Sequence, residues 1–383
     1  MKNNVLALGL TFALGAGMVF GGCGAKKVNA TITADISAQP IPIVAEQVLA
    51  YMQAENDVPI TALQQELGYS RSHRLDLGVP VTMNYTFEAE NNEDFTHGYV
   101  DVFEKGSKTR YVRANVDPYL DDISIYNLKA DTEYDFTISV TLTSGQKVSS
   151  NGSFSTAKSP RFMFVDGASN VRDIGGWASS LGGKIKQGVL YRGSEIDGRK
   201  NVGIAGFTVS ELGISTMLSV MKIKSDFDLR DYASLGINPN SAGILGEGVK
   251  RTFLPSAYYE QILQNPNVLK TVFTAFADES AYPVYLHCTH GVDRAGTISL
   301  VLEALLGVEK ADLIRDYELS NYFYTHVDRY YAENGGDILT LISKLENDYE
   351  GATLADKTAT MLKQAGVTAE QISTIRSIFL ENE

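Results

Sequence analysis

Residues 287–294, HCTHGVDR, place a cysteine and an arginine six positions apart. The apolar run before Cys288 predicts a β-strand, and the run 295–308 after Arg294 predicts an α-helix. The N–H groups of a short loop between a strand and a helix converge, and the helix N-terminus adds partial positive charge. Such a field favours a thiolate, and an arginine can hold two phosphate oxygens through its planar fork. The pattern therefore predicts a phosphate site with Cys288 as nucleophile and Arg294 as clamp.

The chemistry of such a site is phosphoryl transfer through a covalent intermediate. The Cys288 thiolate attacks phosphorus and forms a phosphocysteine, while the loop amides and Arg294 stabilise charge on the equatorial oxygens. A general acid protonates the leaving oxygen, and water then cleaves the thiophosphate. This mechanism needs no metal and no cofactor. The loop positions expected around the phosphate are Thr289, His290, Gly291, Val292, Asp293 and Ala295.

Five segments resemble, in the same order, a bacterial branch of the protein tyrosine phosphatase superfamily. The loop with His287, Cys288 and Arg294 is similar to its HCx5R signature. The other segments are NVRDIGGW (170–177), similar to its NFRDLGG motif, LYRGSEI (190–196), DFDLRD (226–231) and DLIRDYELSN (312–321). The resemblance implies an α/β phosphatase domain over 159–383, with a central sheet flanked by helices. It also implies phosphotyrosine proteins or peptides as substrates, with inositol phosphates or phosphoinositides as the alternative.

The resemblance also suggests which residue supplies the proton to the leaving group. Asp228, in the DLR segment, is the general acid by family position, with Asp293 and Asp231 as alternatives. An aspartate that acts as an acid needs a pKa raised from ~3.9 by burial or by a neighbouring anion. The three aspartates therefore have to be distinguished by their surroundings.

Three further residues are expected to support the site. His287 is expected to form structural hydrogen bonds that tune the thiolate rather than to act as a base. Arg172 and Asp173 lie in the NFRDLGG-like segment, and the alternative for them is an ordinary ion pair that holds the first loop of the domain in place. For Cys288 the alternative is a small buried core residue, which its neighbours in the loop disfavour.

Two positions of the loop depart from the family pattern. Val292 stands where the family usually has a lysine associated with phosphoinositide headgroups, which makes lipid substrates less favoured. Ala295 stands where a Ser or Thr hydroxyl usually stabilises the departing thiolate, and Thr297 is expected to point elsewhere. Breakdown of the phosphoenzyme is therefore expected to be slow. A catalytically weak phosphate-binding surface protein stays open as a second reading.

Strand and helix patterns alternate after the boundary segment AKSPR, residues 157–161. Alternation of this kind predicts an α/β domain with a central sheet. Strands are expected within 190–196, 223–230 and 283–288, and helices within 209–221, 268–280, 295–308, 310–322 and 368–381. In the third helix, apolar residues recur with helical spacing, and Gly307 is placed where a helix would stop.

Residues 61–158 predict an all-β domain. The clearest strand is 134–142, where large apolar residues alternate with Asp, Thr and Ser. Runs within 79–90, 97–106 and 147–157 are further strand candidates, and several short strands at this spacing favour a sandwich. The segment 127–146 resembles a fibronectin type III domain, an immunoglobulin-like sandwich in which Leu128 and Tyr134 would form the tyrosine corner.

The N-terminus predicts an export signal. Residues 1–23 combine a basic start, an apolar run and Cys23 after two small residues, which resembles a bacterial lipobox. Lipidation of Cys23 would attach the protein to a bacterial membrane, facing the cell surface or periplasm. Residues 24–60 are expected to form a tether that leads into loose structure, with a short helix within 45–56.

The charge balance restricts the partners. The formal net charge is -13, which argues against nucleic acid because phosphate backbones are bound through clustered Lys and Arg. An anionic substrate must therefore be held by a local cationic pocket. With Cys23 lipidated, Cys288 is the one remaining thiol of the chain, so an internal disulfide is not expected.

Overall fold

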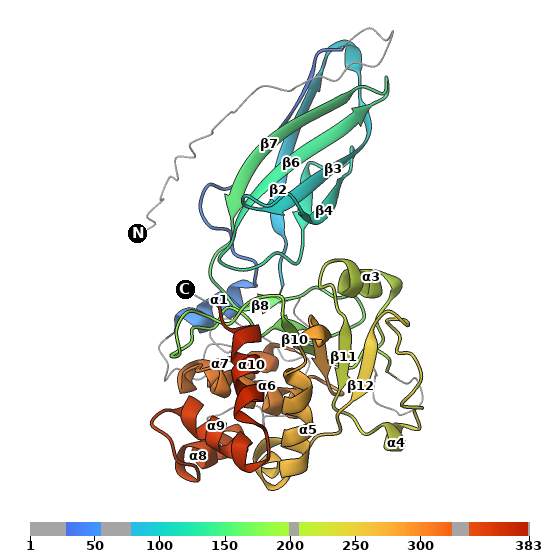
Figure 1. Ribbon diagram of the computed structural model, residues 1–383. Helices are drawn as coiled ribbons and strands as arrows, with labels where there is room; N and C mark the ends of the chain where they lie inside the picture. Colours follow the sequence, from blue (N-terminus) through green and yellow to red (C-terminus); the bar gives the residue numbers. More distant parts are fainter. Residues whose placement is uncertain (1–27, 55–77, 199–206, 324–336, 382–383) are drawn as a thin grey trace. The chain divides into compact units, whose positions relative to one another are not determined.

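The computed structural model describes residues 28–54, 78–198, 207–323 and 337–381 (Figure 1). The chain divides into two compact units. One unit is all-β and takes in the chain up to Ile43 and Val79–Lys158, and the other is α/β and comprises Val44–Gly78 and Ser159–Glu383. Cys23 and the predicted export signal lie outside the described residues.

The all-β unit consists of two antiparallel sheets. One sheet has the order β1-β2-β5, with β1 at Ala30–Asp35, β2 at Val81–Ala89 and β5 at Asp122–Ile125. The other has the order β4-β3-β6-β7, with β4 at Arg110–Val116, β3 at Phe95–Glu104, β6 at Glu133–Leu142 and β7 at Lys147–Ser155. Alternate residues of β6 are buried, as its sequence predicts, because one face of each sheet packs into the core.

Tyr134 closes the loop that leads into β6. Its side chain is completely buried, and its hydroxyl accepts a hydrogen bond of 2.7 Å from the Lys129 N–H, five residues upstream. Leu128, within this loop, is also buried. Leu128 and Tyr134, the two residues singled out in the sequence, therefore stabilise the connection between β5 and β6.

The segment expected to be a tether, 24–60, is ordered over its described residues, so that prediction is wrong there. β1 pairs with β2 over its whole length, and α1 (Glu46–Gln53) belongs to the α/β unit. Tyr51 on α1 donates a hydrogen bond to the Glu318 carboxylate. The strand was missed because ATITAD has few large apolar residues and is ordered by backbone pairing. The predicted short helix is confirmed.

The α/β unit is built on one mixed six-stranded sheet with the order β12-β11-β13-β10-β9-β8. Neighbours from β12 to β10 are parallel, and β9 and β8 are antiparallel. The strands are β8 (Arg161–Phe162), β9 (Arg172–Asp173), β10 (Leu190–Gly193), β11 (Ser225–Asp228), β12 (Lys250–Phe253) and β13 (Val284–His287). β13 is central, so its carboxyl end lies between the ends of β10 and β11.

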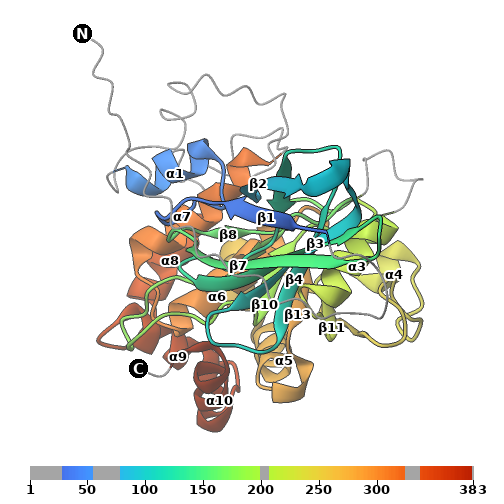
Figure 2. The same cartoon turned by 90° about the horizontal axis from the view of Figure 1, so that it is seen from above.

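Helices cover both faces of this sheet. They are α3 (Glu211–Ser219), α5 (Pro266–Phe276), α6 (Asp293–Leu305), α7 (Lys310–Glu318), α8 (Asp337–Asn347), α9 (Leu354–Gln364) and α10 (Ala369–Phe379). Val284 and Leu286 of β13 join the core with α5 and α6, whereas Tyr285 joins the core with Met217 of α3. Figures 1 and 2 both show α8, α9 and α10 gathered at one side of the unit and α3 at the other.

Helix α6 runs through the middle of its layer. Residues 295–305 are all buried, which is the pattern of a helix covered on every side. It stops before Gly307, which takes a left-handed φ of +84° at the predicted position. The α/β assignment and the strands and helices expected around Cys288 are confirmed. Among the described residues, no helix has the length and apolar character needed to cross a bilayer.

Candidate active site

The loop after β13 carries the predicted cysteine, and the first turn of α6 carries the predicted arginine. β13 ends at His287 and α6 begins at Asp293, so Cys288 directly follows the strand. The Cys288 side chain is 2% exposed and its thiol is free. The predicted order of strand, loop and helix is therefore confirmed.

Four successive carbonyls of this loop, those of residues 289–292, accept hydrogen bonds from outside it. The bonds are Glu195 N–H to Thr289 (3.1 Å), Asn170 Nδ2 to His290 (3.3 Å), Arg192 Nη2 to Gly291 (3.0 Å) and Arg192 Nη2 to Val292 (3.5 Å). These peptides are trans, so each N–H points opposite to its carbonyl. The N–H groups of residues 290–293 therefore point away from the outer partners. Where loop N–H groups of this kind converge, they form an anion-binding concavity.

Arg294 is fixed beside the loop at the second position of α6. Its Nη2 donates to the Thr289 hydroxyl at 3.2 Å, and its Nη1 lies 3.4 Å from the Leu229 carbonyl. Leu229 in turn donates its N–H to the His287 carbonyl at 2.9 Å. These contacts set the plane of the guanidinium against the loop, where a planar fork can hold two oxygens of a phosphate.

Gly291 makes the tight path of the loop possible. It has a left-handed φ of +74°, a conformation that residues with a side chain rarely adopt. A Cβ at this position would collide with the backbone of Gly193, at the end of β10. Only glycine lets the loop approach β10 closely enough for its carbonyls to be held from that side.

A buried ion network supports the loop from below. Arg172 Nε lies 3.1 Å from Asp316 Oδ1, and Arg192 Nη1 lies 2.8 Å from Asp316 Oδ2. Arg172 also donates to the side-chain oxygen of Asn170. Burial would raise the pKa of Asp316, but the two guanidinium groups hold that pKa below its usual value. Arg172 thus supports the loop through Asn170, while Arg192 contacts the loop directly.

Asp173 has a separate structural role. Its carboxylate lies 2.7 Å from Arg161 Nη1 and accepts hydrogen bonds from Gly175 N–H (2.8 Å) and Gly188 N–H (2.6 Å). Burial raises the pKa of Asp173 despite the attraction of Arg161. These contacts hold the beginning of the α/β unit in place, which is the ordinary ion-pair role considered for this position.

The surroundings of Asp228 argue against the prediction that it is the general acid. Its side chain is completely buried, and its oxygens lie 2.8 Å from Arg230 Nε, 2.7 Å from Arg230 Nη2 and 2.6 Å from Arg251 Nη2. Burial would raise the pKa of Asp228, but His287 and both arginines hold it far below the usual range. These surroundings favour the ionised carboxylate, which is the wrong state for a proton donor. The sequence missed this because Arg251 comes from β12, a different part of the chain.

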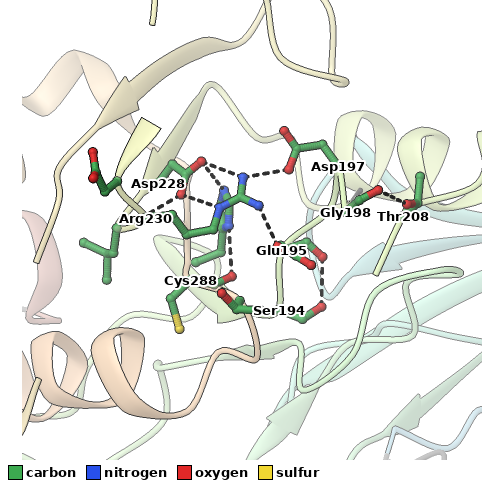
Figure 3. Close-up of polar contacts among 12 residues, drawn as sticks. Ser194, Glu195, Asp197, Gly198, Thr208, Asp228, Arg230 and Cys288 are labelled. Carbon is green, nitrogen blue, oxygen red and sulfur yellow. Dashed lines mark hydrogen bonds and ion pairs between the residues drawn. The ribbon is translucent and has the colours of Figure 1, made fainter. Parts of the chain in front are cut away.

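Arg230 is the centre of the charged cluster around Asp228, as Figure 3 shows. Besides Asp228, its guanidinium lies 2.6 Å from Glu195 Oε2 and 2.7 Å from Asp197 Oδ1. The cluster comprises Glu195, Asp197, Asp226, Asp228, Arg230, Arg251 and His287. It fixes the ends of β10 and β11 against each other on both sides of β13.

His287 connects this cluster to the loop. The imidazole is completely buried, with Nε2 2.9 Å from Asp226 Oδ1 and Nδ1 3.3 Å from the Cys288 carbonyl. Burial lowers the pKa of His287, but Asp228 and Asp226 together raise it above the usual value. The imidazole touches the main chain beside the nucleophile, as a structural partner would.

The two alternative aspartates have very different surroundings. Asp293 is the first residue of α6, is partly exposed, and accepts a hydrogen bond from the Tyr259 hydroxyl at Oδ1. Asp231 is exposed and caps α4 (Tyr232–Leu235) by accepting a hydrogen bond from Ala233 N–H. Of the two, Asp293 lies directly after the loop that carries the nucleophile.

Residues 163–381 match the tyrosine phosphatase family, which is more than half of the chain. The chain belongs to this family. A tyrosine-protein phosphatase from Nostoc commune is 34% identical over 70 residues, 18% of this chain, so the match spans only 24% of that relative's length. Among solved structures, the core catalytic domain of the PP-IP phosphatase SIW14 from S. cerevisiae, in complex with citrate, aligns with a TM-score of 0.27 and 15% identity. That alignment covers 37% of this chain and 78% of the other.

Within this tyrosine phosphatase domain, the two departures from the expected loop pattern are both buried. Val292 and Ala295 are at most 1% exposed. The Thr297 hydroxyl donates to the Asp293 carbonyl and accepts from the Tyr259 N–H, each at 2.8 Å. The prediction that Thr297 points elsewhere is confirmed, and its hydroxyl is used to fix the start of α6.

Several residues of the phosphatase site were not singled out from the sequence. Asn170 and Asp316 lie within the family-like segments, and that position was the available indication of their role. Tyr259 lies outside all of them and gave no signal of its own. Over the described ranges, no group of three or more His, Cys, Asp and Glu side chains is arranged to hold a metal ion.

Proposed function

We propose that this protein hydrolyses phosphomonoesters through a phosphocysteine, with phosphotyrosine in proteins or peptides as its substrate. The observation that carries the proposal is the orientation of the loop at residues 288–294. The carbonyls of residues 289–292 are held from outside, so the N–H groups of residues 290–293 point away from those outer partners. This orientation supports a site in which they bind a phosphate beside Cys288. A tetrahedral oxyanion is the ligand that such a concavity fits.

The first chemical step is attack on phosphorus by the Cys288 thiolate. The S–P bond forms as the bond from phosphorus to the aryl oxygen breaks, while the loop N–H groups and Arg294 hold the three equatorial oxygens. In the second step water attacks the phosphocysteine, and the S–P bond breaks to release inorganic phosphate and the thiolate.

Asp293 is the general acid in this proposal. It begins α6 directly after the loop and is partly exposed, whereas Asp228 lies between two arginines and Asp231 caps another helix. A protonated Asp293 gives its proton to the leaving oxygen in the first step. The carboxylate then takes a proton from the attacking water in the second step.

The charges around the loop favour a singly phosphorylated substrate over inositol polyphosphates. The cluster next to His287 contains four carboxylates against two guanidinium groups, which disfavours further phosphates on that side. Val292 provides no cation where the family usually has one. The relative from Nostoc commune, a tyrosine-protein phosphatase, agrees with this choice. Inositol phosphates and phosphoinositides remain the alternative substrates.

The second candidate function is phosphate binding with slow catalytic turnover. Ala295 has no hydroxyl to stabilise the departing thiolate, and the nearby Thr297 hydroxyl is engaged with Asp293 and Tyr259. The phosphocysteine would then accumulate, because its hydrolysis would be slower than its formation.

The test uses the purified protein beside a Cys288→Ser variant. Phosphotyrosine peptide, p-nitrophenyl phosphate and inositol hexakisphosphate are compared by phosphate release and by mass spectrometry of the protein. We expect the wild type to release phosphate from phosphotyrosine peptide and p-nitrophenyl phosphate, and the variant to release none. A stoichiometric adduct on Cys288 without turnover would favour the second candidate. Phosphate release from inositol hexakisphosphate alone would mean that inositol phosphates, and not phosphotyrosine, are the substrates. Equal release by the variant would rule out the mechanism.

We further propose that Cys23 is lipidated and anchors the protein to a bacterial membrane, with the all-β unit acting as a fibronectin type III-like module before the phosphatase unit. The lipobox-like sequence supports the anchor, and the hydrogen bond from Lys129 to Tyr134 supports the module. Mass spectrometry of the native N-terminus tests the anchor. An intact Met1 or an unmodified Cys23 would contradict it.

A further inference from the structure

We propose that Tyr259 is a positioning residue that orients Asp293 for proton transfer, an inference that rests on the function proposed above. Tyr259 begins the short helix η2 (Tyr259–Gln264) and contacts Asp293 through two routes. Its hydroxyl donates to Asp293 Oδ1. Its N–H donates to the Thr297 hydroxyl at 2.8 Å, and that hydroxyl donates to the Asp293 carbonyl at 2.8 Å. Side chain and main chain of Asp293 are thus both tied to one tyrosine.

The backbone of Tyr259 is held in an unusual conformation to make these contacts. Its φ is +52°, in the left-handed region that bulky side chains rarely occupy. The hydrogen bond to Thr297 fixes this conformation, and only 4% of the residue is exposed. Such conformations persist where the surrounding structure enforces them, and they gather at functional sites.

A second tyrosine extends the contact. The hydroxyls of Tyr259 and Tyr317 lie 2.9 Å apart, and Tyr317 comes from α7, the helix that also carries Asp316. Burial raises the pKa of Tyr259, and the neighbouring Tyr317 and Asp293 raise it further. The phenol therefore keeps its proton and acts as a hydrogen-bond donor to Asp293 rather than as an acid itself.

The consequence for catalysis follows from the two oxygens of the carboxyl group. Because Oδ1 accepts the phenol hydrogen bond, the transferable proton resides on Oδ2. In the first step the Oδ2–H bond breaks and the proton goes to the aryl oxygen as its bond to phosphorus breaks. In the second step Oδ2 takes a proton from water as the new O–P bond forms. Tyr259 keeps its own proton throughout and sets which oxygen performs the transfer.

The test compares substrates that differ in their need for a proton. Phenyl phosphate has a poor leaving group and needs protonation, whereas p-nitrophenyl phosphate has a good one and depends on it little. For Tyr259→Phe we expect kcat/KM for phenyl phosphate to fall about tenfold more than for p-nitrophenyl phosphate, a part of the full contribution of a general acid. Tyr282→Phe is the matched control, because that buried hydroxyl donates to the Phe276 carbonyl, and it should leave the ratio unchanged.

A double-mutant cycle shows whether the effect passes through Asp293. In an Asp293→Asn background, Tyr259→Phe should no longer change the ratio between the two substrates. Equal losses on both substrates, or a selective loss that persists in that background, would overturn the positioning role. Thermal unfolding verifies the fold. Should Tyr259→Phe be unfolded, Tyr317→Phe takes its place. Because Tyr317 is a more distant donor, we expect its kcat/KM for phenyl phosphate to fall about threefold more than that for p-nitrophenyl phosphate. An unchanged ratio between the two substrates would overturn the inference.

The outcomes for the two proposals are distinct. The proposed function fails when the wild-type protein releases no phosphate or when Cys288→Ser releases as much as the wild type. The positioning role fails when the wild type is active and depends on Cys288, yet the ratio of kcat/KM between the two substrates is the same in Tyr259→Phe as in the wild type.

Discussion

Arg230 Nε and Nη2 lie 2.8 and 2.7 Å from the two carboxylate oxygens of Asp228, and a single residue separates the two in the chain. A bidentate pair of this kind fixes both the position and the charge of the carboxylate. Arg251 adds a third contact to the same carboxylate. The DLR segment therefore acts in this protein as a structural clamp between β11 and its neighbours.

The first prediction concerns the variant Asp228→Asn. Removing one partner of a buried ion pair leaves uncompensated charge, so we expect the free energy of unfolding to fall by about 3 kcal/mol. Activity should fall by the same factor for phenyl phosphate and p-nitrophenyl phosphate, because Asp228 donates no proton. Urea unfolding and the two assays measure this. Asp231→Asn, at an exposed helix cap, is the control, and a loss confined to phenyl phosphate would restore Asp228 as the acid.

The second prediction concerns His287 and pH. The pKa of His287 is raised in the folded protein by Asp228 and Asp226, against the effect of burial. The protonated form therefore stabilises the fold fully below the unfolded value of ~6.5, and this contribution is lost as pH rises through the folded pKa. The difference in unfolding free energy between wild type and His287→Gln should shrink from pH 5.5 to pH 9, by roughly 1.4 kcal/mol per unit of raised pKa.

Two features keep that measurement interpretable. The pKa of Asp228 is depressed, so its contribution is complete above ~3.9 and stays constant over this range. Tyr285, stacked on the imidazole at 5.5 Å between ring centroids, has a pKa raised well above its usual value and also keeps one charge state. A difference that is constant from pH 5.5 to pH 9 would mean that His287 is neutral throughout.

The sequence predicted the local frame of the site because its signals are local. An apolar strand, a cysteine, a glycine and an arginine before a long apolar helix fall within 283–305, and the structure has β13, the loop and α6 there. Gly291 and Gly307 have the left-handed φ values that such positions need. The alternation along 134–142 likewise predicted β6, since one face of a strand in a sandwich is buried.

Contacts between distant parts of the chain explain what the sequence did not predict. Asp228 has the residue type of an acid, but Arg251 from β12 removes that capacity. Tyr259 reaches Asp293 only because η2 lies against the start of α6. β1 has too few large apolar residues to be noticed and forms by pairing with β2, whose partner residues lie 49 (Asp35 to Asn84) to 59 (Ala30 to Ala89) positions further on. Such pairings depend on the fold and have no local pattern.

The third prediction concerns Gly291→Ala. The added Cβ would collide with the Gly193 backbone and would also strain a backbone at φ +74°, so the loop must shift. A displacement of about 1 Å can reduce kcat/KM about 100-fold. We expect that loss, with weaker competitive inhibition by inorganic phosphate. Gly182→Ala is the control, because its φ is also positive, at +109°, and its Cβ would meet open space. Unchanged phosphate inhibition in Gly291→Ala would contradict the proposed loop geometry.

The fourth prediction concerns Ala295→Ser, which supplies the hydroxyl that the family usually has after the arginine. Ala295 is fully buried in the first turn of α6, directly after Arg294. The resemblance to the family implies that a hydroxyl at this position donates to the departing sulfur of Cys288. One hydrogen bond of this kind corresponds to about a threefold to tenfold faster breakdown of the phosphocysteine. Rapid mixing with p-nitrophenyl phosphate should show a burst of p-nitrophenol in the wild type and a smaller burst with a higher steady rate in the variant. Ser299→Ala, four residues further along the same buried helix, controls for changes in helix packing. An unchanged burst in Ala295→Ser would mean that another group stabilises the thiolate as it leaves.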